Sequence, residues 1–515
     1  MKENKNKTDK QSKTPNEKAK KVQSQEIIKS KETSNITEGI TKKWLAKTSL
    51  TILLVIIIIA AYILLNFAIE KANITDIDLT SEKVYSLSDT SKSMVEKIDQ
   101  DVKMILINMD TIQSVKDFAY KYSKINEKIT VEEIKDVSTR PDLVSKYNLT
   151  DNSCLMLIQC GDKEKTLVSS DFYTWDYTTG DQKDITEEAI TNALLDVTVE
   201  QKPKIYSLTG HNKYSAEYLY YFKQDIIDEA NEVEDLDLLA KTKVPDDCSA
   251  LLITTLNEDI KEVERDAIID YIHKGGKIIL FSDPNVNKTE MKNFQKVLDE
   301  YGISISEGII LEQDTNKMLS GSPSAIVVTV NSTSSITNQT NMNMNACFMN
   351  AGKINMKDSE ELEKLGVEAE TLATTSSEAF YRSDLTISST SKTDKDESAE
   401  NAVVGALLTK TIDDNTTSKL IVYSNNMFIT NVQISVNSQY YLYALDFYNN
   451  EDLALNSISY LTGRDDTITI RKNTETSTYT VTEQQQNIIL AIIFTVPVVI
   501  VIAGLIVWQV RRRKK

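Results

Sequence analysis

The sequence predicts an α/β protein whose main body lies between two transmembrane helices. Between about residues 75 and 465, short β-rich runs alternate with amphipathic helical periodicity, which is the pattern of a mostly parallel sheet covered by helices. Two uncharged apolar runs, residues 48–69 and 488–510, bracket this body. Each run is long enough to cross the hydrocarbon core of a bilayer as a helix.

Basic residues outside both apolar runs predict the topology. Cytoplasmic flanks of membrane helices carry an excess of Lys and Arg, so both termini are expected in the cytoplasm and the body outside the cell membrane. The flanking basic residues are Lys42, Lys43 and Lys47 before the first run, and Arg511, Arg512 and Arg513 within the basic stop at residues 511–515. Trp44 and Trp508 suit interfacial anchors in contact with membrane lipid.

A cleaved signal peptide is the alternative interpretation of the first run. Its apolar stretch is long for that role, many polar residues precede it, and no small-residue cleavage pattern precedes Glu70. Residues 1–43 are rich in Lys, Asn, Ser and Glu and predict a disordered basic cytoplasmic tail. Residues 466–487 predict a polar linker into the second membrane helix.

Charge and cysteine content exclude several classes of function. The net charge is −18, although both ends are basic, so the body carries the acidic excess and is not expected to bind nucleic acid. The basic ends instead suit an anionic inner leaflet. The four cysteines, Cys154, Cys160, Cys248 and Cys347, have no CxxC spacing, so neither a metal site nor a cofactor is expected. The composition suits a bacterial surface protein.

The body divides into two predicted domains. Residues 75–200 have the order β-α-β-α-β-β-α, which is thioredoxin-like but lacks a redox cysteine pair. The predicted elements are strands at 102–107, 129–137, 154–159 and 164–169, and helices at 111–126, 141–147 and 185–199.

The second predicted domain covers residues 203–465. Its strands are expected at 204–208, 233–238, 250–254, 277–281, 402–408 and 420–424, and its helices at 215–230, 260–273 and 453–461. Asp259, with Glu262 three residues later, predicts the cap of the helix at 260–273. Residues 286–401, partly rich in Ser, Thr and Asn, predict a β-rich insertion.

No catalytic residue is assigned, and few residues suggest a ligand site. The P-loop motif is absent, so ATP hydrolysis is expected from another subunit. Gly210 and His211 follow a strand and enter a helix, where α/β sheets hold ligands. A loop-packing or hydrogen-bonding histidine is the favoured alternative. Asp283 also follows a strand, and either a ligand role or a turn before Pro284 explains it.

Two further features have alternative explanations. His273 ends a predicted helix, where a capping or surface role is expected. Tyrosines at 214, 218, 220 and 221, with Phe222, lie on one predicted helix and suit either a sugar or partner surface, or a core with one exposed flank.

A set of short motifs resembles the GldG family, which is named for a gliding-motility protein and comprises auxiliary components of ABC-2-type transporters. The motifs are Asp78-Leu79-Thr80, Tyr85-Ser86-Leu87-Ser88, Thr186-Glu187, Thr191-Asn192-Ala193-Leu194, Lys202-Pro203-Lys204-Ile205-Tyr206, Leu208-Thr209-Gly210-His211, Val244-Pro245-Asp246-Asp247, Gly275-Gly276-Lys277, Asp283-Pro284 and Asn456-Ser457-Ile458-Ser459-Tyr460-Leu461-Thr462-Gly463. The resemblance implies a membrane-anchored partner of an ABC-2-type permease and a separate ATPase. It also implies a glutamine-amidotransferase-like second domain. Asn212 follows Gly210-His211 where relatives often have Gly-Glu.

The first hypothesis is therefore a non-enzymatic transport accessory whose ectodomain contacts an unidentified cargo or the envelope. Two alternatives stay open. One is an amidotransferase-like hydrolase that uses the His211 loop, and the other is a membrane-tethered module that binds a glycan or peptide.

Overall fold

The computed structural model describes residues 86–176, 181–337, 345–435 and 441–464, with single positions at 56, 60, 63, 64 and 512. All of the described ranges belong to the unit Thr80–Lys515. Among the described residues, no helix combines the length and apolar character needed to span a bilayer. Apart from those single positions, the predicted membrane runs, the basic tail, the linker and the anchors Trp44 and Trp508 lie outside the described residues.

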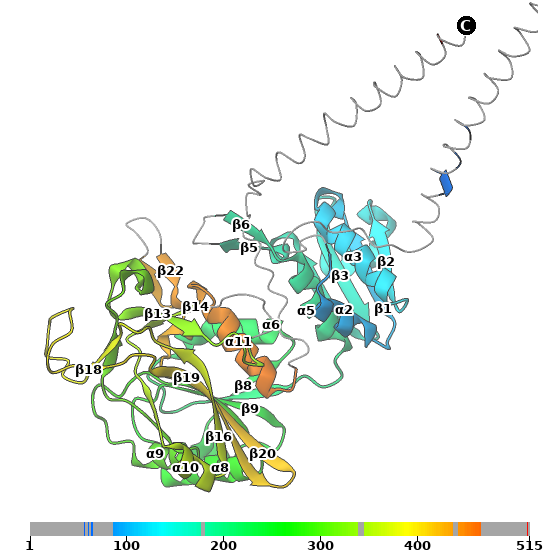
Figure 1. Ribbon diagram of the computed structural model, residues 1–515. Helices are drawn as coiled ribbons and strands as arrows, with labels where there is room; N and C mark the ends of the chain where they lie inside the picture. Colours follow the sequence, from blue (N-terminus) through cyan, green and yellow to red (C-terminus); the bar gives the residue numbers. More distant parts are fainter. Residues whose placement is uncertain are drawn as a thin grey trace, which may run out of the picture. The chain divides into compact units, whose positions relative to one another are not determined.

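The first part of the body contains a four-stranded sheet in the order β2-β1-β3-β4 (Figure 1). β1 pairs in parallel with β2 and antiparallel with β3, and β3 pairs antiparallel with β4. The strands are β1 (Val102–Ile107), β2 (Ile129–Ile134), β3 (Leu155–Cys160) and β4 (Lys163–Val168), and the helices are α2 (Asp89–Glu96), α3 (Gln113–Ile125), α4 (Pro141–Tyr147) and α5 (Thr186–Thr198). A small hairpin, β5 (Tyr173–Asp176) and β6 (Asp181–Asp184), precedes α5. The order of the main elements is the predicted one.

Sequence periodicity explains why α3 packs on this sheet. Its buried residues, Val115, Phe118, Ala119 and Tyr122, recur at the three- and four-residue intervals of one helix face. They join one core with Met104 and Leu106 of β1. Ile105 and Ile107, which point to the opposite face of β1, belong to a second core with α4. The sheet is therefore covered on both faces.

The second part is built on a nine-stranded sheet in the order β14-β13-β16-β19-β20-β10-β9-β7-β8. Its strands are β7 (Lys204–Leu208), β8 (Glu232–Leu236), β9 (Cys248–Thr254), β10 (Lys277–Phe281), β13 (Ala325–Val330), β14 (Asn345–Met349), β16 (Val367–Thr374), β19 (Val403–Asp413) and β20 (Thr416–Tyr423). The pairs from β8 through β7, β9 and β10 to β20 are parallel. The pairs from β20 through β19, β16 and β13 to β14 are antiparallel.

The prediction of a mostly parallel sheet is therefore wrong for half of this sheet. β19 and β20 are joined directly by a short turn after Asp413, and such a connection can only make an antiparallel pair. The predicted insertion at 286–401 supplies β13, β14 and β16 to the main sheet. It also supplies small sheets made of β11 (Ile303–Ile305) with β15 (Ile354–Met356), and of β12 (Ile309–Leu311), β17 (Phe380–Arg382) and β18 (Glu397–Ser398).

Helices cover both faces of the parallel half (Figure 1). Ile205 and Ile279 share a core with α6 (Tyr220–Asp228) and α11 (Asn450–Leu461). Tyr206 and Ile278, each one position away along its strand, share the other core with α8 (Glu262–His273), α9 (Lys292–Asp299) and α10 (Ser359–Lys364). Alternation of side chains along each strand thus divides one apolar run between two cores.

Helix caps differ from the prediction. The N-cap of α8 is Lys261, and the Glu264 carboxylate accepts a hydrogen bond from its backbone N–H at 2.8 Å. Asp259 instead accepts from the backbone N–H groups of Asn293 and Phe294, at 2.8 and 2.9 Å, in the first turn of α9. The acid at Asp259 therefore caps the neighbouring helix, because the fold brings the starts of α8 and α9 together.

The helix predicted at 215–230 is divided in the structure. A 3₁₀ turn, η4 (Ala216–Leu219), precedes α6. Because a 3₁₀ turn has three residues per turn, it changes the phase of the apolar face. Tyr220 and Ile227 of α6 are 60% and 38% exposed.

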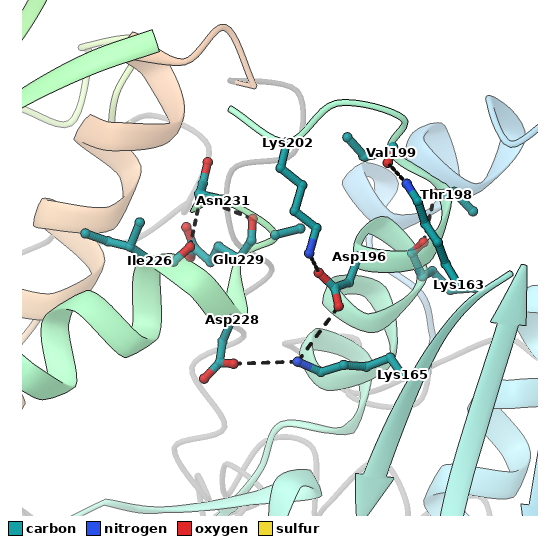
Figure 2. A network of polar contacts seen from close by, with 12 residues as sticks. Lys163, Lys165, Asp196, Thr198, Val199, Lys202, Ile226, Asp228, Glu229 and Asn231 are labelled. Carbon is teal, nitrogen blue, oxygen red and sulfur yellow. Dashed lines mark hydrogen bonds and ion pairs between the residues drawn. The ribbon is translucent and has the colours of Figure 1, made fainter. Parts of the chain in front are cut away.

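A polar network surrounds the carboxyl end of α5 (Figure 2). Lys163 donates to the carbonyl of Val199 at 2.6 Å, beside the orphan carbonyls at the end of the helix. Asp196 pairs with Lys202. Lys165 lies 4.0 Å from Asp196 and 3.7 Å from Asp228 of α6, so one lysine bridges acids from the two parts of the body.

Candidate functional site

The candidate site lies at the carboxyl ends of the parallel strands in the large sheet. β7 has β8 on one side and β9 on the other, so the direction of winding reverses there, and α/β proteins bind ligands at such switch points. We call the polar side chains gathered there the carboxyl-edge cluster. Its members are His211, Lys213, Tyr214, Thr255, Asp283 and Asn426.

Asp283 is the centre of this cluster and is 7% exposed. One carboxylate oxygen accepts hydrogen bonds from the Lys213 ammonium at 2.7 Å and the Tyr214 hydroxyl at 2.8 Å. The other accepts from the backbone N–H of Asn426 at 2.8 Å. Burial, followed by the charge of Asp283, raises the pKa of Tyr214, which therefore stays protonated as a donor. Both oxygens of Asp283 are thus engaged by the protein itself.

Thr255 links the same groups through its own backbone and side chain. Its hydroxyl accepts from the Asp283 N–H at 2.8 Å, and its N–H donates to the Asn426 side-chain oxygen at 3.1 Å. The loops after β9, β10 and β20 therefore share one hydrogen-bond network. Because these groups are buried, each bond also satisfies a polar atom that would be costly to leave unpaired.

His211 is held between two carboxylates, and its side chain is 3% exposed. Nδ1 lies 3.2 Å from Glu258 Oε1, and Nε2 lies 2.9 Å from Glu264 Oε2. An ionised carboxylate only accepts, so both bonds form when the ring carries both protons. Since Glu264 also caps α8, the imidazole ties the loop after β7 to that helix. Both ring nitrogens of His211 are thus engaged by protein carboxylates.

Backbone hydrogen bonds join the loops after β7 and β9. The Asn257 N–H donates to the His211 carbonyl at 2.7 Å, and the Lys213 N–H donates to the Thr255 carbonyl at 2.8 Å. Asn212 adds side-chain bonds to the Leu208 carbonyl at 3.0 Å and the Thr254 hydroxyl at 2.8 Å. These bonds hold the loops after β7 and β9 together at the switch point.

Gly210 adopts a backbone conformation that favours glycine. Its φ is +105°, and a Cβ built on it would meet no atom within 4 Å. The conformation of the loop, and not the space around it, therefore explains the glycine.

A pocket of about 120 Å³ lies beside Asp283, between the end of β10 and α9. Polar groups of Asn257, Ser282 and Asn285 line it together with the apolar side chains of Phe294 and Leu298. Gly210 and His211 are not among its lining residues. The structure brings the three predicted site residues, Gly210, His211 and Asp283, to one edge of the sheet. Only Asp283 lines the pocket.

The sequence interpretation missed Lys213, Thr255 and Asn426, and it placed Tyr214 in the aromatic cluster instead of this site. A signal was present, because Lys213 and Tyr214 continue the His211 loop, while Thr255 and Asn426 follow strands whose apolar runs were recognised. What the sequence did not supply was the order of those strands in the sheet, which decides whose carboxyl ends are neighbours.

A cysteine–histidine pair is not formed at this edge. Cys248 begins β9 and so lies at the end of the parallel strands opposite to His211. Burial raises the pKa of its thiol to about 11, which disfavours the nucleophilic thiolate. Among the described residues, no group of three or more His, Cys, Asp or Glu side chains could hold a metal ion.

Comparison with solved structures finds chains of low sequence identity. The mmIFT52 N-terminal domain has 13% identity and a TM-score of 0.36, covering 50% of this chain and 97% of that chain. A putative ThuA-like protein from Bacteroides uniformis has 12% identity and a TM-score of 0.31, and the match covers 51% of this chain and 92% of that chain. A putative ThuA-like protein from Parabacteroides merdae has 9% identity and a TM-score of 0.31, and the match covers 51% of this chain and 91% of that chain. At these TM-scores the likenesses carry no argument about this chain.

Comparison with curated proteins finds no match. The family described as "ABC-type uncharacterized transport system" matches residues 202–457. This range runs from just before β7 into α11 and includes the whole carboxyl-edge cluster. The match confirms the relationship that the sequence motifs indicate, and through residues 202–457 this chain belongs to that family of auxiliary ABC transport components.

Proposed function

We propose that this chain is a membrane-anchored, non-catalytic auxiliary subunit of an ABC-2-type transporter. The observation that carries the proposal is the family match over residues 202–457. The absence of a P-loop motif from the sequence supports a separate ATPase, and the two apolar runs support docking beside a permease in the cell membrane. In this arrangement both termini lie in the cytoplasm, and the body, including the large sheet, lies outside.

The role of the body is to contact cargo or envelope. The carboxyl-edge cluster supports a scaffold, because the polar groups of His211 and Asp283 are already bonded to protein partners. A hydrolase that used the His211 loop would first have to break the bonds of the imidazole to Glu258 and Glu264. The pocket beside Asp283 is below the size of usual small-molecule sites, which hold about 300 Å³ or more.

Affinity purification of the full-length protein in mild detergent from its own cells tests the proposal. The expected result is recovery of a multi-span permease and an ATPase with a P-loop motif, identified by mass spectrometry. Recovery of the chain alone, or with cell-wall enzymes only, would contradict the transporter assignment.

Variants of His211 distinguish the scaffold from the hydrolase. For the scaffold, Glu258→Gln leaves transport unchanged, because the glutamate is 63% exposed and the imidazole keeps its bond to Glu264. His211→Ala lowers the amount of folded protein but not transport per folded molecule. His273→Ala is the matched control, since this histidine is half exposed and pairs with Glu300. Loss of function in a His211→Ala protein that folds and assembles normally would support the hydrolase instead.

A further inference from the structure

Five tyrosines from two distant parts of the chain form an exposed aromatic surface on the second part of the body. We call this the tyrosine surface. Its members are Tyr218 of η4, Tyr220 and Tyr221 of α6, and Tyr441 and Tyr443 of β22 (Tyr441–Tyr443). The rings of Tyr220 and Tyr221 have centroids 5.4 Å apart, and those of Tyr221 and Tyr443 are 5.0 Å apart. The contact with Tyr443 joins helix and hairpin into one surface.

The geometry of the hairpin places Tyr441 on the same side. β22 pairs with β21 (Gln433–Ser435), and its middle residue, Leu442, is buried at 4% exposure. Residues two apart on a strand share a face, so Tyr441 and Tyr443 both project away from the core. A backbone bond of 2.9 Å from Asn431 to the Tyr218 carbonyl holds η4 against the segment that leads into this hairpin.

Four of these five rings are exposed to solvent. Tyr220 is 60% exposed and Tyr441 61%, while Tyr218 and Tyr221 are 46% and 41% exposed. Large apolar groups that gather on a surface, rather than occurring singly, mark interaction sites. Tyrosine is also enriched at protein interfaces, where its ring offers a large contact area at low entropic cost.

The charges beside the tyrosine surface indicate what it binds. In the described residues of η4, α6, β21, β22 and the neighbouring 3₁₀ turns η8 (Met427–Ile429) and η9 (Ala444–Asp446), the acids are Glu217, Asp225, Asp228 and Asp446. Of these, Asp228 is paired with Lys165 at 3.7 Å. Lys223 is the one basic residue in the same described elements, and Asp235 neutralises it at 2.6 Å. Aromatic faces and carboxylates both attract cations.

We propose that the tyrosine surface is the docking site for a Lys- or Arg-bearing segment of a protein partner, with cationic side chains placed over the tyrosine rings. The inference rests on the proposed function, because it takes that partner to be an external loop of the permease. The non-parallel packing of the rings fits this occupant better than a sugar chain. Tyr220 and Tyr221 meet at 71°, which leaves no common flat platform.

Binding of a defined peptide to the purified full-length protein tests the chemistry. The probe is a peptide of alternating Arg and Gly, and its control has citrulline, which is uncharged and nearly the same shape, at each Arg. We expect the Arg peptide to bind about tenfold more tightly than the citrulline peptide. Equal binding of the two peptides would overturn the proposal.

Variants then assign the binding to the rings. Tyr220→Leu with Tyr441→Leu keeps apolar area but removes the aromatic faces, and about fivefold weaker binding is expected. Tyr220→Phe with Tyr441→Phe keeps the faces and should bind within about twofold of the wild type. Tyr120→Leu is the control at an exposed tyrosine elsewhere, 39% exposed, and should have no effect. Leu variants that bind as the wild type does would overturn the proposal.

Photo-crosslinking in cells tests the partner separately. A benzophenone side chain at position 220 should crosslink to a Lys- or Arg-containing external peptide of the permease, whereas the same group at position 120 should not. Crosslinks to glycan alone would assign the surface to a carbohydrate and overturn the proposal. Suppose that the permease co-purifies with the wild type, does not crosslink at position 220, and still co-purifies with the tyrosine variants. The docking inference is then wrong, while the proposed function stands. If no transport subunit co-purifies with the wild type, the proposed function fails.

Discussion

Arg382 and Asp396 form an ion pair whose side chains are only 3% and 1% exposed. The guanidinium donates two parallel hydrogen bonds to the carboxylate, at 2.8 and 2.7 Å. It also donates to the carbonyls of Ser389 and Ser391, and the Thr393 N–H donates to Asp396 at 2.7 Å. A single arginine thus fixes the connection between β17 and β18, which has little apolar side-chain packing of its own.

Arg382→Met tests the importance of this pair. The substitution keeps much of the side-chain volume but leaves Asp396 buried without its cation, so a loss of about 3 to 5 kcal/mol in unfolding free energy is expected. Lys395→Met is the matched control, because the Lys395 side chain is 74% exposed. Its Nζ lies 3.7 Å from the Asp384 carboxylate, which makes a long surface ion pair. The control substitution should cost well under about 1 kcal/mol. Urea unfolding of both proteins measures the difference, and equal effects would contradict the argument.

The same pair predicts a pH dependence. Hydrogen bonding from Arg382, followed by that from Thr393, holds the pKa of Asp396 well below its usual range. A group whose folded pKa is depressed stabilises the fold above its unfolded pKa, near about 3.9 for Asp, and this stabilisation is lost as pH falls toward the folded pKa. The stability difference between wild type and Asp396→Asn should therefore shrink as pH falls from about 5 to 3. A constant difference across this range would exclude the assignment.

At the scale of elements, one buried network explains several of the motifs on which the family resemblance rests. Glu187 of α5 accepts from the Ser88 N–H and from the Ser91 hydroxyl, both at 2.6 Å. Thr191, one turn along α5, meets the hydroxyls of Ser91 at 3.2 Å and Tyr122 at 2.5 Å. Ser88 is also the N-cap of α2. These residues therefore attach α2, at the start of the described chain, to α5.

Glu187→Ala should detach α2 locally. The change leaves the Ser88 N–H and Ser91 hydroxyl without their acceptor, at a cost of about 1 to 3 kcal/mol. Glu187→Gln keeps a side-chain oxygen at the same position and should cost less. Hydrogen exchange in α2 measures the effect, because amides in a loosened helix exchange faster than those in the core strands. Unchanged exchange in the Ala variant would show that apolar packing of Met94 and Val95 holds the helix by itself.

The elements that the sequence predicted well are those with strong local periodicity. The strand at 102–107 and the short helix at 141–147 have the predicted bounds, the second because Pro141 begins it. The break between η4 and α6 was not predicted, because the pattern around Tyr220 is apolar throughout and does not reveal a change of phase. The strand order of the sheet depends on long-range pairing. Nothing in the local sequence of β16 predicts that β19 is its antiparallel neighbour.

At the scale of the whole molecule, the sequence located the candidate site only in part. His211 and Asp283 were candidates because each follows a predicted strand, and both lie at the carboxyl edge. Their partners, such as Glu264 and Asn426, come from segments far away in sequence, so whether the side chains are free or bonded depends on the fold. The tyrosine surface shows the same limit, since Tyr221 and Tyr443 become neighbours only when the hairpin packs beside α6.

Topology itself is testable with added cysteines, and two of the native thiols are poorly reactive. Burial raises the pKa of Cys248 to about 11 and that of Cys347 to about 12, so neither forms much reactive thiolate at neutral pH. Asn152→Cys adds an exposed thiol in the body. Ser24→Cys adds a thiol within residues 1–43, the predicted basic tail. If the body lies outside, a membrane-impermeant maleimide labels the cysteine at position 152 on intact cells. The cysteine at position 24 is then labelled only after permeabilisation, because the reagent cannot cross the bilayer. Wild type sets the background, and labelling of position 24 on intact cells would contradict cytoplasmic termini and the anchoring on which the proposed function depends.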